Sequence, residues 1–98
     1  MRFENKAAFV TGGGSGIGEA AVVALAARGA RVVVADVNIE NATRVARSIQ
    51  DQGGSAMAVP VDVSDASSVD SAFNAAEHWY GSTTHLLLNS AGILGIHA

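Results

Sequence analysis

The sequence contains no cysteine, one lysine and one proline, and it has few charged residues for its length of 98. Without cysteine, the chain cannot form disulfide bonds or thiolate metal sites. Charged residues make up 15% of the sequence and the formal net charge is −3, which gives no electrostatic reason to expect binding to nucleic acid or to an anionic membrane. No apolar run approaches the length of a membrane-spanning helix, and the start of the sequence lacks the apolar segment of a signal peptide. We therefore expect a cytoplasmic protein that binds neither nucleic acid nor membrane.

Apolar residues make up 49% of the sequence, and they fall into two alternating patterns. Short, nearly continuous apolar runs predict four strands, over residues 6–10, 31–36, 56–61 and 85–89. Apolar residues at three- and four-residue spacing predict three helices between them, over 16–27, over 39–52, and from the Ser64-Asp65 cap to Gly81. The length allows one domain, so we expect a single domain over residues 1–98.

Strands that alternate with helices through short connections predict an α/β fold, with a parallel sheet covered by helices on both faces. Pro60 removes a backbone donor from the third strand, so that strand should lie at an edge of the sheet. In the first helix, the spacing predicts which face packs on the sheet, namely Ala20, Val23, Ala24 and Ala27.

A glycine-rich turn, Thr-Gly-Gly-Gly-Ser-Gly-Ile-Gly over residues 11–18, joins the first strand to the first helix. Gly12 can take the backbone angles of a sharp turn, Gly16 lets an anion approach the main chain, and Gly18 allows close packing. The free N–H groups and the positive end of the helix then face the turn. This arrangement suits a pyrophosphate and predicts a dinucleotide-binding domain; a flexible glycine loop with no ligand is the alternative.

Asp36 ends the second strand, 18 positions after Gly18. A carboxylate at this place can accept hydrogen bonds from the adenosine ribose hydroxyls, and it repels a 2′-phosphate. Ser15 and Val37 supply no base that would reverse this preference. We therefore expect NAD to be preferred over NADP, with a solvated turn acid as the alternative.

These features, together with Asp62-Val63 after the third strand and Asn-Ser-Ala-Gly over residues 89–92 after the fourth, resemble the short-chain dehydrogenase/reductase family. The resemblance spans essentially the whole sequence. It implies a Rossmann-type sheet with strand order 3-2-1-4, truncated after the fourth strand. It also implies that this is the amino-terminal half of an enzyme that transfers a hydride between a nicotinamide and an alcohol or carbonyl carbon.

The resemblance assigns cofactor-binding roles to residues that match the family pattern. Asp62 and Val63 match the pair that lines the adenine pocket, although Asp62 could instead stabilise its own turn. Asn89 matches the residue that supports the sheet beside the cofactor, although it could serve only local backbone groups. Ser90 stands where a second asparagine is commoner. The implied cofactor-binding set is Thr11, Gly12, Ser15, Gly16, Ile17, Gly18, Asp36, Asp62, Val63, Asn89, Ala91 and Gly92.

No catalytic residue can be assigned, because the family's reaction needs a Tyr-x-x-x-Lys pair preceded by a serine. The only tyrosine is Tyr80, the residue four positions later is Thr84, and the only lysine is Lys6. We therefore interpret Tyr80 as a packing residue and do not expect these residues alone to be an active enzyme. The three histidines have no metal-ligand spacing, so no metal site is expected.

Two other functions stay open at this point. The chain could be a non-catalytic NAD- or adenosine-binding module or a structural fragment, or a methyltransferase with the same type of fold. The turn at residues 89–92 argues against the methyltransferase. The apolar fourth strand should lie at the second edge of the sheet, where we expect it to mediate self-association, most simply as a homo-oligomer.

Overall fold

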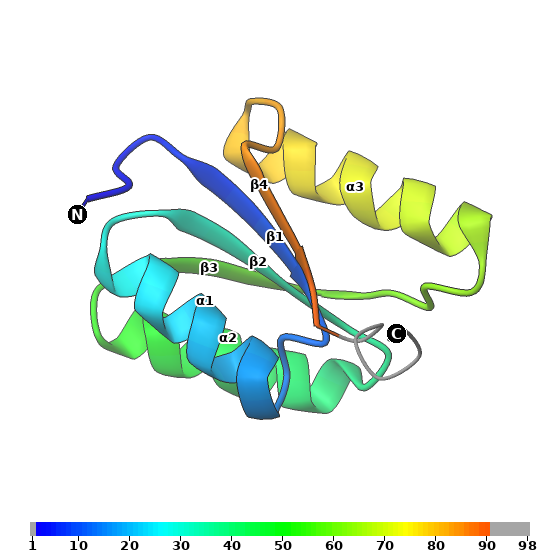
Figure 1. Ribbon diagram of the computed structural model, residues 1–98, viewed down its shortest axis with the longest axis horizontal. Helices are drawn as coiled ribbons and strands as arrows, with labels where there is room; N and C mark the ends of the chain where they lie inside the picture. Colours follow the sequence, from blue (N-terminus) through cyan, green and yellow to red (C-terminus); the bar gives the residue numbers. More distant parts are fainter. Residues whose placement is uncertain (1, 91–98) are drawn as a thin grey trace.

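The computed structural model describes residues 2–90, and their elements alternate as the sequence predicts (Figure 1). The elements are β1 (Ala7–Thr11), α1 (Gly16–Ala27), β2 (Arg31–Asp36), α2 (Ile39–Asp51), β3 (Ser55–Pro60), α3 (Ala66–Tyr80) and β4 (Leu86–Asn89). The strands form one sheet in the order β3-β2-β1-β4, and every neighbouring pair is parallel. Helices α1 and α2 cover one face and α3 covers the other. The predicted fold class and strand order are therefore confirmed.

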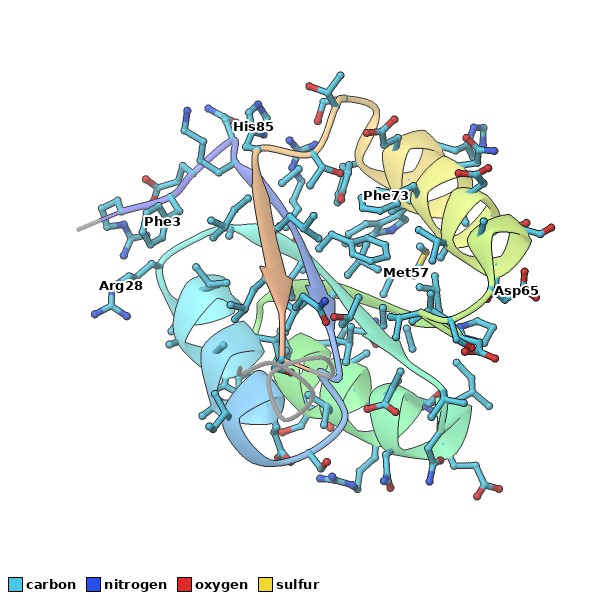
Figure 2. All side chains as sticks on the ribbon, turned by 45° about the vertical axis from the view of Figure 1, so that its right-hand side comes forward. Phe3, Arg28, Met57, Asp65, Phe73 and His85 are labelled. Atoms are coloured by element: carbon cyan, nitrogen blue, oxygen red, sulfur yellow. The ribbon has the colours of Figure 1, made fainter. Side chains whose placement is uncertain are left out.

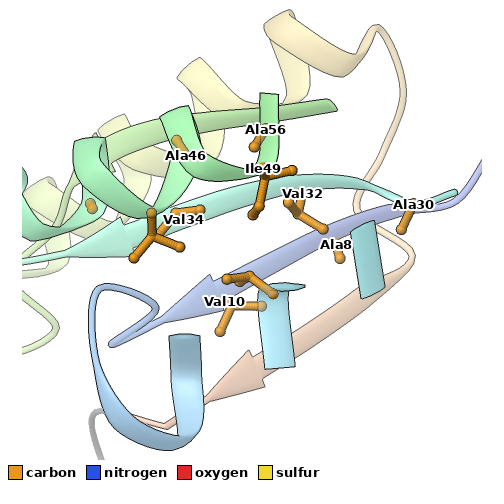
Figure 3. Close-up of a cluster of buried hydrophobic side chains, with 11 residues drawn as sticks. Ala8, Val10, Ala30, Val32, Val34, Ala46, Ile49 and Ala56 are labelled. Atoms are coloured by element: carbon orange, nitrogen blue, oxygen red, sulfur yellow. The ribbon is translucent and has the colours of Figure 1, made fainter. Parts of the chain in front are cut away.

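Two apolar clusters, one on each face of the sheet, form the core. Because side chains alternate along a strand, Val10, Val32 and Val34 face α1 and α2, where Ile49 packs on them (Figure 3). Phe9 and its neighbours face α3. The central strands β1 and β2 are thus buried on both faces, as their continuous apolar runs indicate.

The face toward α3 is closed by aromatic packing. The rings of Phe9 and Phe73 are stacked with their centroids 4.2 Å apart. Phe73 and Met57 both lie between the sheet and α3 (Figure 2). Tyr80 is buried at the end of the helix, and Gly81 ends it in the left-handed conformation, as the sequence predicts.

The predicted buried face of α1 is wrong. Ala20, Val23, Ala24 and Ala27 are exposed, whereas Gly18 and Val22 are the buried residues of the helix. The helix carries small or apolar residues on nearly every side, so residue spacing alone does not select the face that packs. The backbone of the glycine turn selects it instead, because the turn brings Gly18 directly onto Gly12.

Both edge strands lie where the sequence places them. Strand β3 forms one edge, and Pro60 is its last residue. Strand β4 forms the other edge, and no further strand of residues 2–90 pairs with it. Leu87 pairs in register with Phe9, so its side chain lies on the same face of the sheet as α3. Helix α3 does not cover this part of the face, and the Leu87 side chain is 56% exposed. Within the described residues, β4 is therefore an apolar strand that is incompletely covered.

The uncovered edge predicts that the 98-residue chain associates with itself. Unpaired backbone groups beside exposed leucines recruit another strand, so light scattering should show a dimer, a larger species or aggregation. Leu87→Lys should shift the chain to a monomer, and it should be tolerated because the side chain is largely exposed.

Val23→Lys is a matched control for this prediction, because Val23 is also an exposed apolar residue but lies on α1. That variant should associate like the unmutated chain. A stable monomer of the unmutated chain would show that β4 does not recruit a partner.

Candidate functional site

The residues singled out from the sequence gather at the carboxyl edge of the sheet. Thr11 ends β1, Asp36 ends β2 and Asn89 ends β4. Because the strands are parallel, these ends meet at one edge, where the chain turns from β1 into α1 (Figure 1). Strand order reverses direction between β1 and β4, and open α/β sheets bind ligands at such a switch point.

The glycine turn depends on backbone angles at two positions and on space at others. Gly12 and Gly16 have φ values of 70° and 58°, which other residues adopt only with strain. A Cβ at Gly18 would overlap the carbonyl oxygen of Gly12 and would lie 2.6 Å from Ser90 Oγ. A Cβ at Gly13 would lie 3.0 Å from Val34 Cγ1. Gly18 therefore packs on the turn itself rather than on the strand.

The first turn of α1 presents its N–H groups without acceptors. Ser15 is the N-cap residue, but its side chain accepts no capping hydrogen bond. Residues 2–90 provide no acceptor for the N–H groups of Gly16, Ile17 and Gly18. A Cβ at Gly16 would meet no atom of residues 2–90 within 4 Å, so these residues leave the space beside the N–H groups open. Together with the positive end of the helix, they form a site for an anion.

The carboxylate of Asp36 is held in one orientation by two backbone donors. Gly14 N–H donates to Oδ2 at 2.9 Å, and Asn38 N–H donates to Oδ1 at 3.0 Å. Asp36 does not cap α2, because the Asn38 side chain does so by accepting the Asn41 N–H at 3.1 Å. The bond from Gly14 was not foreseen from the sequence. It fixes the acid beside the glycine turn.

A hollow of about 200 Å³ opens between the ends of β2 and β3. Exposed valine side chains border it, with Val37 76% and Val63 47% accessible. Apolar side chains beside an acid give a place for a flat heterocycle with polar edges. The lining residues are Gly12, Asp36, Val37, Val61, Asp62 and Val63.

Asp62, at the rim of this hollow, also organises its own turn. Its Oδ1 accepts the Ser64 hydroxyl at 2.6 Å and the Ser64 N–H at 3.0 Å. The Ser64 hydroxyl, and then the Ser64 N–H, hold the pKa of the Asp62 carboxyl below its ordinary value. Asp62 therefore stays ionised at neutral pH, and the turn-stabilising role left open by the sequence is present.

The end of β4 braces the start of the glycine turn. Thr11 Oγ1 donates to Asn89 Oδ1 at 2.6 Å. Ser90 Oγ–H lies 2.6 Å from the Thr11 carbonyl oxygen and 3.2 Å from that of Gly12. Ser90 thus ties β4 to the first glycine of the turn, a role that the sequence alone did not reveal. Ala91 and Gly92 lie outside the described residues.

Tyr80 and His85 lie outside the predicted cofactor-binding set and have structural roles. The Tyr80 hydroxyl lies 2.8 Å from Thr84 Oγ1, and burial raises the pKa of Tyr80, which fits a packing residue. His85 lies at the start of β4, where its Nδ1 accepts the Ala7 N–H at 2.9 Å (Figure 2). Within residues 2–90, no group of three or more histidine or acidic side chains is placed to hold a metal ion.

The sheet order, the glycine turn and the acid after β2 define a Rossmann-type nucleotide-binding fold. Within this class, the chain belongs to the short-chain dehydrogenase family, whose family model matches residues 6–98. Membership in this family excludes the methyltransferase alternative. None of the helices in the described part of the chain is long and apolar enough to cross a membrane.

Individual relatives agree with this family. The chain is 40% identical over 94 residues to cyclohexanol dehydrogenase from Acinetobacter sp. (strain SE19), covering 96% of this chain and 37% of that protein. It is 44% identical over 93 residues to meso-2,3-butanediol dehydrogenase from Serratia marcescens, covering 95% and 36%. The crystal structure of a short chain dehydrogenase/reductase from Burkholderia phymatum in complex with NAD matches it with a TM-score of 0.83 at 33% identity, over 89% of this chain and 31% of that one. The chain thus spans between 31% and 37% of the length of these three proteins.

The open space at Gly16 predicts that Gly16→Val abolishes dinucleotide binding. The branched side chain would occupy the space beside the free N–H groups of α1, and calorimetric titration should show no binding. Valine in a left-handed conformation should also cost about 1–2 kcal/mol of stability.

Gly81→Val separates these two effects, because Gly81 has a similar φ of 70° and lies at the end of α3, away from the turn. A Cβ at Gly81 would meet no atom of the described part of the chain within 4 Å. Both variants should lose similar thermal stability, but only Gly16→Val should lose binding. A folded Gly16→Val variant that still binds would rule out this position for the anion.

Proposed function

We propose that this chain is the NAD-binding portion of a short-chain dehydrogenase/reductase that transfers a hydride between nicotinamide and an alcohol or carbonyl substrate. The observation that carries the proposal is the fixed carboxylate of Asp36 beside an uncapped helix N-terminus. The residues present fit a dinucleotide. The N–H groups of residues 16–18 would receive the pyrophosphate, Asp36 the adenosine ribose, and the hollow bordered by Val37 and Val63 the adenine.

The preference for NAD over NADP rests on the charge at Asp36. Its two oxygens already accept backbone N–H groups, and the remaining lone pairs are free to accept the two ribose hydroxyls. The 2′-phosphate of NADP would lie beside this carboxylate and would be repelled by its negative charge. The only nearby base in the described turn region, Arg44, is already paired with Glu19. The sequence analysis expected no basic residue near Asp36 and did not foresee Arg44. Because Glu19 neutralises the charge of Arg44, the expected preference for NAD is unchanged.

The nicotinamide ring, when bound, would supply the hydride chemistry. The residues of this sequence would bind and orient the cofactor, while proton transfer needs a positioned acid or base. Tyr80 is buried, and Lys6 precedes β1 at the end of the strand opposite the glycine turn, so neither supplies one. A cytoplasmic location stays a prediction.

Replacing Asp36 should narrow the difference in affinity between NAD and NADP. Asp36→Ala removes both the ribose acceptor and the repulsion. Calorimetry should therefore show NAD binding weakened by about tenfold or more, since tenfold is the smallest effect expected for one lost hydrogen bond to a charged group, while NADP binding holds or improves. Asp36→Asn removes the charge with little change of shape. Relative to the unmutated chain, it should also raise the affinity for NADP compared with that for NAD.

Asp51→Ala is the matched control, because Asp51 is an exposed acid at the far end of α2. It should leave both affinities unchanged. Equal affinity of the unmutated chain for NAD and NADP would refute the proposed preference.

A non-catalytic NAD- or adenosine-binding module is the second candidate, and it differs from the first in needing no Tyr-x-x-x-Lys pair. Both candidates predict that the purified 98-residue chain produces no NADH from any alcohol. Steady NADH production would contradict both. Reading the coding sequence past Ala98 distinguishes them, because only the enzyme requires a serine and a Tyr-x-x-x-Lys pair there.

A further inference from the structure

Gly14, in the middle of the glycine turn, is held from two sides. Its N–H donates to Asp36 Oδ2 at 2.9 Å, and its carbonyl oxygen accepts from Arg44 Nη2 at 3.1 Å. The turn also sits directly on α2. A Cβ at Gly14 would lie 2.9 Å from Asn41 Cβ and 3.1 Å from the Ala42 nitrogen. Among the described residues, no other residue of the turn has both its N–H group and its carbonyl oxygen bonded to charged side chains of other elements.

Arg44 also reaches α1 and so connects three parts of the site. Its Nη2 lies 3.2 Å from Glu19 Oε1, and its Nη1 lies 3.5 Å from Glu19 Oε2. An ion pair as exposed as this one contributes little to stability by itself. The ion pair does, however, fix the direction of the Arg44 side chain. Glu19 orients the planar guanidinium while the guanidinium donates to the Gly14 carbonyl oxygen.

The direction of the Gly14 carbonyl sets the direction of the next N–H group. Peptide bonds in residues 2–90 are all trans, so the Ser15 N–H points opposite to the Gly14 carbonyl. When Arg44 draws that oxygen toward α2, the Ser15 N–H points away from α2. A carbonyl oxygen that turned the other way would place negative partial charge near a bound anion.

We propose that Arg44 is a positioning residue for the cofactor: through the Gly14 carbonyl, it holds the glycine turn in the conformation that receives the pyrophosphate. The proposal rests on the proposed function, since it concerns the same site. It also identifies the kind of ligand group on which Arg44 acts, an anionic diphosphate and not the adenosine portion.

The test compares Arg44→Ala with Arg47→Ala by calorimetric titration of NAD and of adenosine. Arg47 is an exposed arginine on the same helix, and it makes no hydrogen bond or ion pair within residues 2–90, so it controls for lost charge and for helix propensity. Arg44→Ala should weaken NAD binding about fivefold to tenfold, the size expected for loss of one ordinary hydrogen bond. Arg47→Ala should bind NAD like the unmutated chain.

Adenosine binding supplies the readout that a merely structural role would not give. Adenosine lacks the pyrophosphate, so the Arg44→Ala variant should bind adenosine with the same affinity as the unmutated chain. Arg44→Lys should recover only part of the NAD affinity, because one ammonium cannot reproduce the planar fork that serves Gly14 and Glu19 together. This variant also keeps the test valid if Arg44→Ala fails to fold.

The outcomes separate this proposal from the proposed function. If the unmutated chain binds NAD and Arg44→Ala binds it like Arg47→Ala, the role of Arg44 is wrong and the proposed function stands. Equal losses for NAD and adenosine, or full recovery by lysine, would also overturn the role of Arg44. If the unmutated chain binds no NAD, both proposals fail.

Discussion

The site depends on one steric constraint, the direct contact between Gly18 and the carbonyl oxygen of Gly12. No side chain fits between them, so α1 begins immediately against the end of β1. This contact leaves the N–H groups of the first helical turn at the carboxyl edge of the sheet and brings Gly14 within reach of both Asp36 and Arg44. A larger residue at position 18 would separate the helix from the turn and displace each of these groups.

The supports of the turn come from three separate directions. Strand β2 contributes Asp36, helix α2 contributes Arg44, and the end of β4 contributes Ser90. Each bond is to a backbone group of residues 11–14. A turn built largely of glycine has little conformational restraint of its own, since glycine loses more freedom on folding than any other residue. The surrounding elements therefore supply the order that the turn sequence lacks.

Much of this arrangement could be predicted because it is local or follows from topology. The turn angle at Gly12, the place of Asp36 after β2 and the edge position of the strand with Pro60 all follow from residue type and chain order. The left-handed angle of Gly16 was not predicted, because that residue was expected only to let an anion approach the main chain. The buried face of α1 could not be predicted, because the helix is apolar on most sides. The contacts of Gly14, Arg44 and Ser90 join residues far apart in the chain, and no pattern in the sequence marks them. The roles of the individual site residues toward a ligand stay predictions.

The exposed edge of β4 restricts the geometry of any symmetric assembly built on it. A twofold axis relates identical surfaces, so two copies joined at this edge would place their β4 strands antiparallel. Every strand pair within residues 2–90 is parallel, so the two copies would share one continuous mixed sheet. Among these strands, the antiparallel junction would lie at the centre of that sheet. Strand β4 has only four residues, so this junction would rest on few backbone bonds and would draw most of its stability from the leucine side chains on either side.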